Sequence, residues 1–418
     1  MRAVTLCAEI EALWGPPADD GPVVEPHQLS HLARPDEQAL RLAWAAFCSP
    51  TRDLVPLRRL LAETDALARI RTALVWPEQT ERQLKAAPIW RLTPDRLTTA
   101  AIQRDLDRSI AMARAGLLAD PALHEAWEVQ RWGAWCAEAR TARFFPVGLC
   151  LLALARTGGV AEERVRGLMA SERCEDGYRY YGKWRGIPPD ADDAGLALQL
   201  LPFCPDQRDA LQHTVDLLRQ NRHGDGWLPT WLEQGLREPT LPDAPTWLVR
   251  RCAAVNARAL LGLLDAEWPL PEGWIQHSVN RLAQVLETEG AIDAYPRDYG
   301  ELLVARLGTR VSGLEDFCVA LGRRVLATRE KDGGWGSPHA TACRLMTADI
   351  LGLDMDPRPA ALYLCTRQEP DGLWPREALY HCPGRDHRQH DYATRSVTSA
   401  LCLEALSSAS TALSASAG

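Results

Sequence analysis

Residues 368–375 read QEPDGLWP, and related turn sequences recur along the chain between segments with a helical pattern. The related stretches are EDGYRYYGKW at 175–184, HGDGWLPTW at 223–231 and KDGGWGSP at 331–338. With a degenerate copy around Gly290, they recur at intervals of roughly 40 to 65 residues, the size of a helical repeat. A unit of this size corresponds to two antiparallel helices joined by a turn. The chain is therefore predicted to consist of αα-hairpins.

Apolar residues at three- and four-residue spacing predict helix almost everywhere, and strand-like alternation is nearly absent. The fold class is therefore all-α. Hairpins can stack openly or close into a ring, and their spacing alone does not decide between the two. The expected helices are 53–72, 101–114 and 123–137, then 144–156 with 160–171, 190–202 with 206–220, 247–264 with 272–287, 294–306 with 313–328, 338–352 with 357–368, and finally 391–408.

The composition excludes several classes of function. The 418 residues include 47 Lys and Arg and 55 Asp and Glu, and the resulting net charge of -8 argues against a general nucleic-acid binder. No apolar stretch approaches the length of a membrane span, and the N-terminus lacks the pattern of a signal peptide. The twelve cysteines show no zinc-type spacing. A reduced, cytoplasmic protein is expected.

The run Gln368 to Trp374 matches Q-x-x-x-G-x-W, the core of the QW repeat of squalene-hopene cyclases and their relatives. Other copies are imperfect: Arg replaces Gln at 329–335, the loop is longer at 220–227, and the Trp is lost at 173–179. The resemblance implies a closed α/α toroid of about six hairpins, with inner and outer helix rings. On this basis we expect an N-terminal helical region at 1–118, the α/α barrel at 119–408 and a flexible tail at 409–418.

A second stretch, Pro189-Asp190-Ala-Asp192-Asp193-Ala-Gly195, resembles the D-x-D-D motif of class II terpene cyclases, with Gly195 where the family commonly has Ala. Protonation of an alkene or epoxide needs a strong acid in a dry cavity, and like charges in such a site cannot all ionise. The resemblance implies that Asp192 donates the proton and that Asp190 and Asp193 support it. The alternative is that the aspartates only cap a helix N-terminus.

Aromatic side chains would stabilise the cations of such a reaction, although packing between helices is the alternative role for each of them. The expected substrate-binding aromatics are Tyr181, Trp184, Trp374, Tyr380 and Tyr392. A basic loop, REALYHCPGRDHRQHDYATR at 376–395, could bind an anionic head group or be a solvated surface loop. The expected cationic contacts to the substrate are Lys183, Arg185 and Arg385.

The sequence therefore favours a proton-initiated cyclase of a linear isoprenoid, either a polyprene or a polyprenyl diphosphate. A ring that binds an isoprenoid or a protein partner without chemistry is the alternative. It is favoured by the imperfect QW copies and by the expectation that the roughly 120 residues before the ring do not form the second helical domain of hopene- and copalyl-type enzymes. A zinc site like that of protein prenyltransferases is not expected, because no Asp-x-Cys precedes Cys343 or His390. No cofactor is expected, apart from Mg²⁺ if the substrate is a diphosphate; the chain has no D-D-x-x-D motif.

Overall fold

The computed structural model describes residues 99–119, 128–131, 134–137, 143–159, 162–175, 177–179, 188–232, 252–288, 295–383 and 389–417. The chain divides into two compact units, of which the first comprises Met1–Ala101 with Glu369–Asp371 and the second Ile102–Gln368 with Gly372–Gly418. The expected helix at 53–72 lies outside the described residues. The structural features below belong to the second unit, apart from residues 99–101 at the start of one helix and residues 369–371 in one turn.

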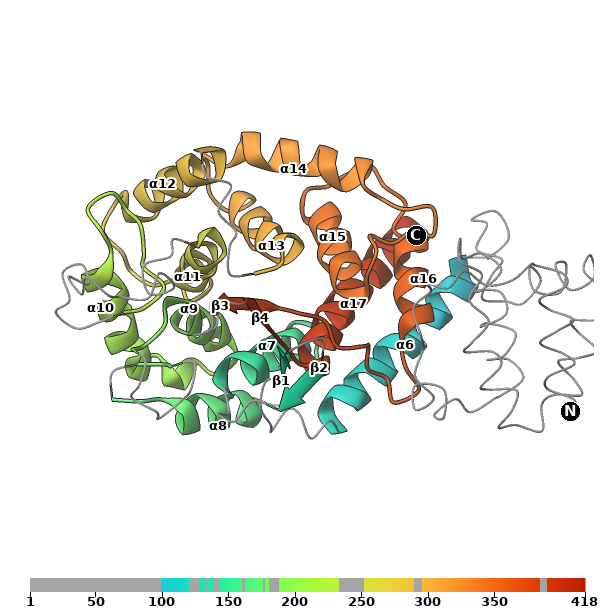
Figure 1. Cartoon of the computed structure of the whole chain (residues 1–418), viewed down its shortest axis with the longest axis horizontal. Helices are drawn as coiled ribbons and strands as arrows, with labels where there is room; N and C mark the ends of the chain where they lie inside the picture. The colour runs from blue at the N-terminus through green and yellow to red at the C-terminus, as the bar shows by residue number, and fades with distance from the viewer. Residues whose placement is uncertain are drawn as a thin grey trace, which may run out of the picture. The chain divides into compact units, whose positions relative to one another are not determined.

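Six inner helices form a closed ring (Figure 1). Each inner helix packs on the next along the chain, and the last packs on the first. The closed ring that the family resemblance implied is confirmed. The inner helices are α7 (Phe144–Arg156), α9 (Ala191–Leu200), α11 (Ala253–Asp265), α13 (Arg297–Gly308), α15 (Pro338–Ile350) and α17 (Arg395–Ala417).

An outer helix follows each of the first five inner helices and packs against it. The inner helices are buried on nearly all sides, as in α9, where all ten residues are buried. The outer helices bury one face, as α12 (Trp274–Thr288) does through Trp274, Ser278, Leu282 and Val285. The outer helices are α8 (Glu162–Glu172), α10 (Gln212–Asn221), α12 (Trp274–Thr288), α14 (Glu315–Ala327) and α16 (Arg358–Arg367). Three short 3₁₀ turns, Leu201–Phe203, Pro205–Gln207 and Asp209–Leu211, connect α9 to α10.

Helix α6 (Thr99–Ala119) contacts the turn that follows α16 (Figure 1). The Ser109 hydroxyl of α6 donates to Gln368 Oε1 at 2.6 Å, and Arg114 donates to the Thr157 carbonyl after α7. The sequence assigned residues up to 118 to a separate N-terminal region, whereas Ile102 and the residues after it belong to the ring unit.

The last helix also differs from expectation, since α17 continues to Ala417 where a flexible tail was expected from residue 409. Leu413 is buried, and Ser410 accepts a hydrogen bond from Gln103 of α6. These contacts give the Ala- and Ser-rich end of the chain a packed face, which its composition alone does not reveal.

The turn at residues 368–374 has a hydrogen-bonding pattern that explains its sequence. The Gln368 side-chain amide donates to the Gly372 carbonyl at 2.9 Å, and the Trp374 indole N–H donates to the Leu364 carbonyl of α16 at 2.8 Å. Gly372 has φ +85°, and a Cβ there would collide with the Met112 carbonyl of α6. The Gln, Gly and Trp of the motif therefore bind the turn to its own helix.

The imperfect copy at 329–335 repeats this pattern with different side chains. Arg329 Nε donates to the Gly333 carbonyl at 3.2 Å, and the Trp335 indole donates to the Val325 carbonyl at 3.0 Å. Both hydrogen bonds of the complete motif are therefore retained, the one to the glycine carbonyl and the one to the helix before the turn. Arg329 thus performs the hydrogen bonding that Gln368 performs in the complete copy.

In the described residues, one antiparallel sheet contains four short strands: β1 (Glu128–Arg131), β2 (Ala134–Ala137), β3 (Tyr380–Pro383) and β4 (Gln389–Ala393). Their order in the sheet is β2-β1-β4-β3. The helices expected at 123–137 and from 391 are wrong at these positions. Strand β1 pairs with β4, more than 250 residues later in the chain, so local periodicity could not reveal the sheet. In Figure 1, β3 and β4 are seen within the outline of the ring, just before α17 begins.

No helix in the described part of the chain is long and apolar enough to cross a membrane.

Candidate active site

Asp190 is the N-cap of inner helix α9. Its extended backbone (φ -120°, ψ 133°) lets its Oδ1 accept from the backbone N–H of Asp192 at 2.6 Å and of Asp193 at 3.4 Å. The neighbouring segment holds this position, because Ala191 N–H donates to the Thr230 carbonyl at 2.7 Å. Helix capping therefore accounts for Asp190 and leaves the other two carboxylates to be explained.

Asp192 is buried and has a stabilising partner on each oxygen. Arg258 of α11 forms an ion pair with Asp192, with 2.8 Å between Nε and Oδ1. The Tyr295 hydroxyl, just before α13, donates to Asp192 Oδ2. Both partners favour the ionised form of Asp192, so they stabilise the conjugate base that remains after it releases a proton.

Asp193 is only 1% exposed, and neither of its carboxyl oxygens has a hydrogen-bond partner among the described residues. Ionising such a carboxyl would leave a buried charge unpaired. The neutral form of Asp193 is therefore the stable one.

Burial raises the pKa of all three carboxyls, and the groups around each carboxyl then make the three pKa values differ. The pKa of Asp190 rises to about 8, because burial and the nearby Asp192 outweigh the two backbone hydrogen bonds. Burial raises the pKa of Asp193 well above its ordinary value, and Asp190 and Asp192 add to this. Burial also raises the pKa of Asp192, but Arg258 and Tyr295 oppose the rise. Burial therefore favours the protonated form of Asp192, while Arg258 and Tyr295 stabilise the carboxylate that remains after the proton is transferred.

Two glycines bring α9 and α11 into close backbone contact at this site. A Cβ on Gly195 would lie 2.8 Å from the Ala259 N and Cα atoms, and one on Gly262 would collide with the Gly195 carbonyl. The close approach places Arg258, which is 1% exposed, directly against Asp192. It also explains the glycine at position 195.

Aromatic rings surround the Asp192–Tyr295 pair. The Tyr295 ring lies 6.3 Å from Phe145, 5.4 Å from Tyr299 and 5.6 Å from Tyr380, measured between ring centroids. Tyr380 in turn lies 5.8 Å from Tyr392, its partner across the β3–β4 pairing. The acid group therefore lies beside an aromatic wall formed by four separate segments of the chain.

The arrangement of the helices resembles that of solved terpene cyclases. The type II terpene cyclase MstE from Scytonema is 18% identical, with a TM-score of 0.58, and the match covers 74% of this chain and 99% of that one. A variant of MstE in complex with geranylgeranyl dihydroxybenzoate, its substrate, gives 19% identity and the same TM-score and coverage. A protein from Actinoplanes is 20% identical, with a TM-score of 0.55, covering 75% of this chain and 99% of that one.

The chain has the α/α-barrel fold of the terpenoid cyclases. No protein-family model matches the sequence, and no curated protein sequence matches it. In this α/α barrel the D-x-D-D stretch opens an inner helix, as its sequence position suggested.

The structure brings together five of the eleven predicted site residues. Asp190, Asp192 and Asp193 lie together at the start of α9, and Tyr380 and Tyr392 lie in the aromatic wall. Trp374 is fully buried in the turn after α16, where its indole N–H is bonded to that helix, so its contacts are those of a packing residue. Tyr181, Lys183, Trp184, Arg185 and Arg385 lie outside the described residues.

Sequence reasoning missed the residues that act on Asp192. Arg258 stands alone as a charged residue in the run AAVNARALLGLL at 253–264, and an isolated arginine in an otherwise apolar helix was the available signal. Tyr295 follows the degenerate repeat around Gly290, where no motif marked it. Phe145 and Tyr299 lie in helices that were predicted, but no pattern distinguished them from core residues.

No group of three or more His, Cys, Asp or Glu side chains suited to a metal ion occurs among the described residues.

Proposed function

We propose that this protein is a class II terpene cyclase that starts the cyclisation of a linear isoprenoid by proton transfer from Asp192. The observation that carries the proposal is the pairing of Asp192 with Arg258 and Tyr295 inside a buried carboxyl cluster, beside an aromatic wall. The structural likeness to type II terpene cyclases supports it.

Acid strength selects Asp192 from the three carboxyls. A proton donor to carbon must leave behind a stable carboxylate, and only Asp192 has both a cation and a hydroxyl donor on its oxygens among the described contacts. Asp193 has no such partner among the described residues, which makes it the weaker acid. Asp190 is engaged by the backbone of α9. Burial helps Asp192 to keep its proton until substrate binds.

The reaction that follows is an isomerisation. The π electrons of the terminal double bond form a new C–H bond with the Asp192 proton, and the resulting carbocation is attacked in turn by the next double bonds. The last cation loses a proton to water, and the Asp192 carboxylate regains a proton from solvent, so the enzyme is restored and the product is an isomer of the substrate. The faces of Tyr295, Tyr380 and Tyr392 can stabilise the positive charge and exclude water.

The substrate class proposed is a linear isoprenoid: a polyprene, a polyprenyl diphosphate, or a polyprenyl aromatic acid of the type bound by MstE. No resident cofactor is proposed, and Mg²⁺ would accompany the substrate only if its head group is a diphosphate.

The test is incubation with geranyl, farnesyl and geranylgeranyl diphosphates, squalene and geranylgeranyl dihydroxybenzoate, with the products identified by mass spectrometry. Asp192→Asn keeps the shape of the site but removes its transferable proton, so product formation should fall at least about 100-fold. Substrate affinity should be retained.

Asp190→Asn and Asp193→Asn should impair cyclisation less, since they change the environment of the donor and not the donor itself. Asp206→Asn, on the exposed turn after α9, is a control that should leave activity unchanged. Cyclisation by Asp192→Asn at the wild-type rate would eliminate the proposed acid. Binding without turnover in the wild type would instead support the alternative of a non-catalytic isoprenoid-binding barrel.

A further inference from the structure

A chain of polar contacts runs from the acid cluster along the interior of the ring. Arg258 NH1 donates to Gln199 Oε1 at 3.0 Å, and Gln199 Nε2 donates to Asp265 Oδ2 at 3.0 Å. Gln199 lies near the end of α9 and Asp265 ends α11. The contacts therefore connect Asp192, at the start of the inner helices, with their opposite ends.

Gln199 is oriented by its two partners. It is 2% exposed, its carbonyl faces a guanidinium and its amide faces a carboxylate. Reversing the amide would place N–H groups against Arg258 and an oxygen against Asp265. Only one orientation of Gln199 satisfies both neighbours.

Arg258 uses its whole guanidinium group in the same arrangement. Its Nε faces Asp192, NH1 faces Gln199 and NH2 donates to the Tyr299 hydroxyl. The group also lies 5.4 Å from the centroid of the Phe145 ring. A planar fork with several fixed donors can satisfy these partners together, which a lysine ammonium cannot.

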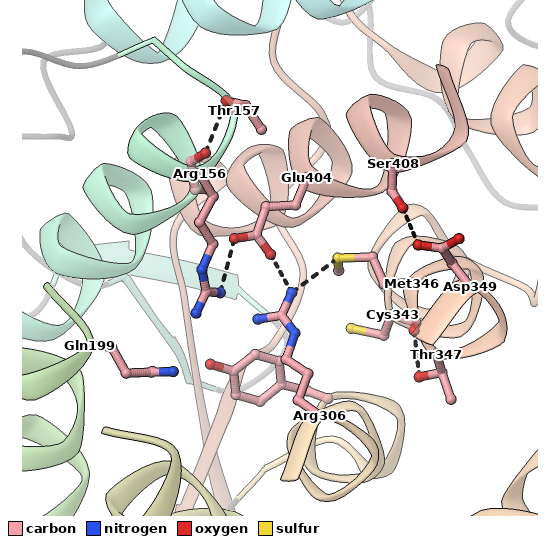
Figure 2. A network of polar contacts seen from close by, with 12 residues as sticks. Arg156, Thr157, Gln199, Arg306, Cys343, Met346, Thr347, Asp349, Glu404 and Ser408 are labelled. Atoms are coloured by element: carbon pink, nitrogen blue, oxygen red, sulfur yellow. Dashed lines mark hydrogen bonds and ion pairs between the residues drawn. The ribbon is translucent and has the colours of Figure 1, made fainter. Parts of the chain in front are cut away.

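The far end of the chain of contacts is anchored by an ion-pair network. Asp265 forms ion pairs with Arg310 and, at 3.8 Å, with Arg156. Arg156 from α7 also approaches Glu404 of α17 at 3.3 Å, and Figure 2 shows Gln199 pointing toward the same space. These residues line a cavity of about 930 Å³ at the ends of the inner helices. Asp265 is therefore held by contacts from several segments of the ring.

We infer that Gln199 and Asp265 are positioning residues of the acid, holding the Arg258 guanidinium in the orientation that stabilises the Asp192 carboxylate. The effect on catalysis rests on the proposed function, whereas the positioning of Arg258 by Gln199 and Asp265 does not. The described titratable groups facing the Asp192–Arg258 pair are Asp190 and Asp193 on α9, and Tyr295 and Tyr299 at α13.

The direction of the effect follows from the contacts. Activity requires protonated Asp192 and is lost as pH rises through its pKa. Arg258 opposes the rise of that pKa, so loosening Arg258 should raise it further. The alkaline limb of the pH–rate profile should then move to higher pH, while the rate below it falls because the acid is weaker.

The experiment compares Gln199→Leu with Gln368→Leu. Both remove a glutamine with two or more side-chain hydrogen bonds, but Gln368 lies in the turn after α16 and bonds Ser109 and Gly372 instead. For Gln199→Leu we expect kcat to fall about tenfold, the equivalent of one hydrogen bond to a charged group, with little change in KM. The control should lose thermal stability and keep the wild-type pH profile.

A second readout needs no substrate. Infrared titration of the carboxyl bands, with Asp192 assigned by the Asp192→Asn difference, should show a higher midpoint for Asp192 in Gln199→Leu and an unchanged one in Gln368→Leu. If Gln199→Leu does not fold, Gln199→Met, which is closer in shape, replaces it. An unchanged Asp192 midpoint would overturn the inference. A moved midpoint in a protein that cyclises none of the substrates would support the positioning role and reject the proposed function.

Discussion

Replacing Gly195 by alanine tests the close contact of α9 and α11 on which the acid site depends. The added Cβ would lie 2.8 Å from Ala259 N, Ala259 Cα and the Arg258 carbonyl carbon. All three are backbone atoms, so no side chain can turn aside and the helices must separate. Such overpacking costs up to about 3 kcal/mol, and alanine regains about 1 kcal/mol of helix propensity. We expect a net loss of about 2 kcal/mol in the free energy of unfolding.

Urea unfolding measures this loss, which should appear as a lower midpoint with an unchanged slope. Gly167→Ala is the matched control, since Gly167 lies on the exposed side of α8 and a Cβ there would meet no atom within 4 Å. It should gain up to about 1 kcal/mol. Separation of the helices also moves Arg258 away from Asp192, so cyclisation by Gly195→Ala should fall about tenfold. Gly195→Ala with wild-type or greater stability would refute the close backbone contact.

Two further predictions concern single polar contacts. Tyr295→Phe removes the hydroxyl that donates to Asp192 but keeps the ring. The value of kcat should therefore fall about 10- to 100-fold, while thermal stability changes little. An unchanged kcat would exclude a catalytic role for this hydrogen bond. Burial alone would raise the pKa of Glu404, but its partners Arg306 and Arg156 hold that pKa at about 2. Ionised Glu404 should therefore contribute roughly 3 kcal/mol to the free energy of unfolding above pH 4.5, and this contribution should be lost as pH falls through about 2. The unfolding free energies of wild type and Glu404→Gln, measured from pH 7 downward, should therefore approach each other in acid, and a difference that does not vary with pH would contradict this.

The helical repeat could be predicted because each turn carries its own local chemistry. The hydrogen bonds of Gln368, Gly372 and Trp374 all lie within one turn and the helix before it, so their sequence pattern is sufficient. The start of α9 was predictable for the same reason, since Asp190 caps its own helix. Features that depend on one short segment are those that the sequence revealed.

The remaining features depend on segments far apart in the chain. Arg258 meets Asp192 because α9 and α11 approach through Gly195 and Gly262, and no local pattern states which helices will be neighbours. The β1–β4 pairing is equally non-local, and residues 123–137 taken alone have a helical pattern. The ring closure was reached through a family resemblance, because hairpin spacing does not distinguish a ring from an open stack.

Deuterium transfer tests the central claim most directly. The wild-type protein equilibrated in D₂O exchanges the Asp192 carboxyl proton for deuterium, and cyclisation begins with transfer of that deuteron to a substrate carbon. Mass spectrometry and NMR of the cyclised product should therefore find one deuterium, on the carbon of the terminal double bond that receives the proton. A cyclised product without deuterium at that carbon would contradict protonation as the initiating step.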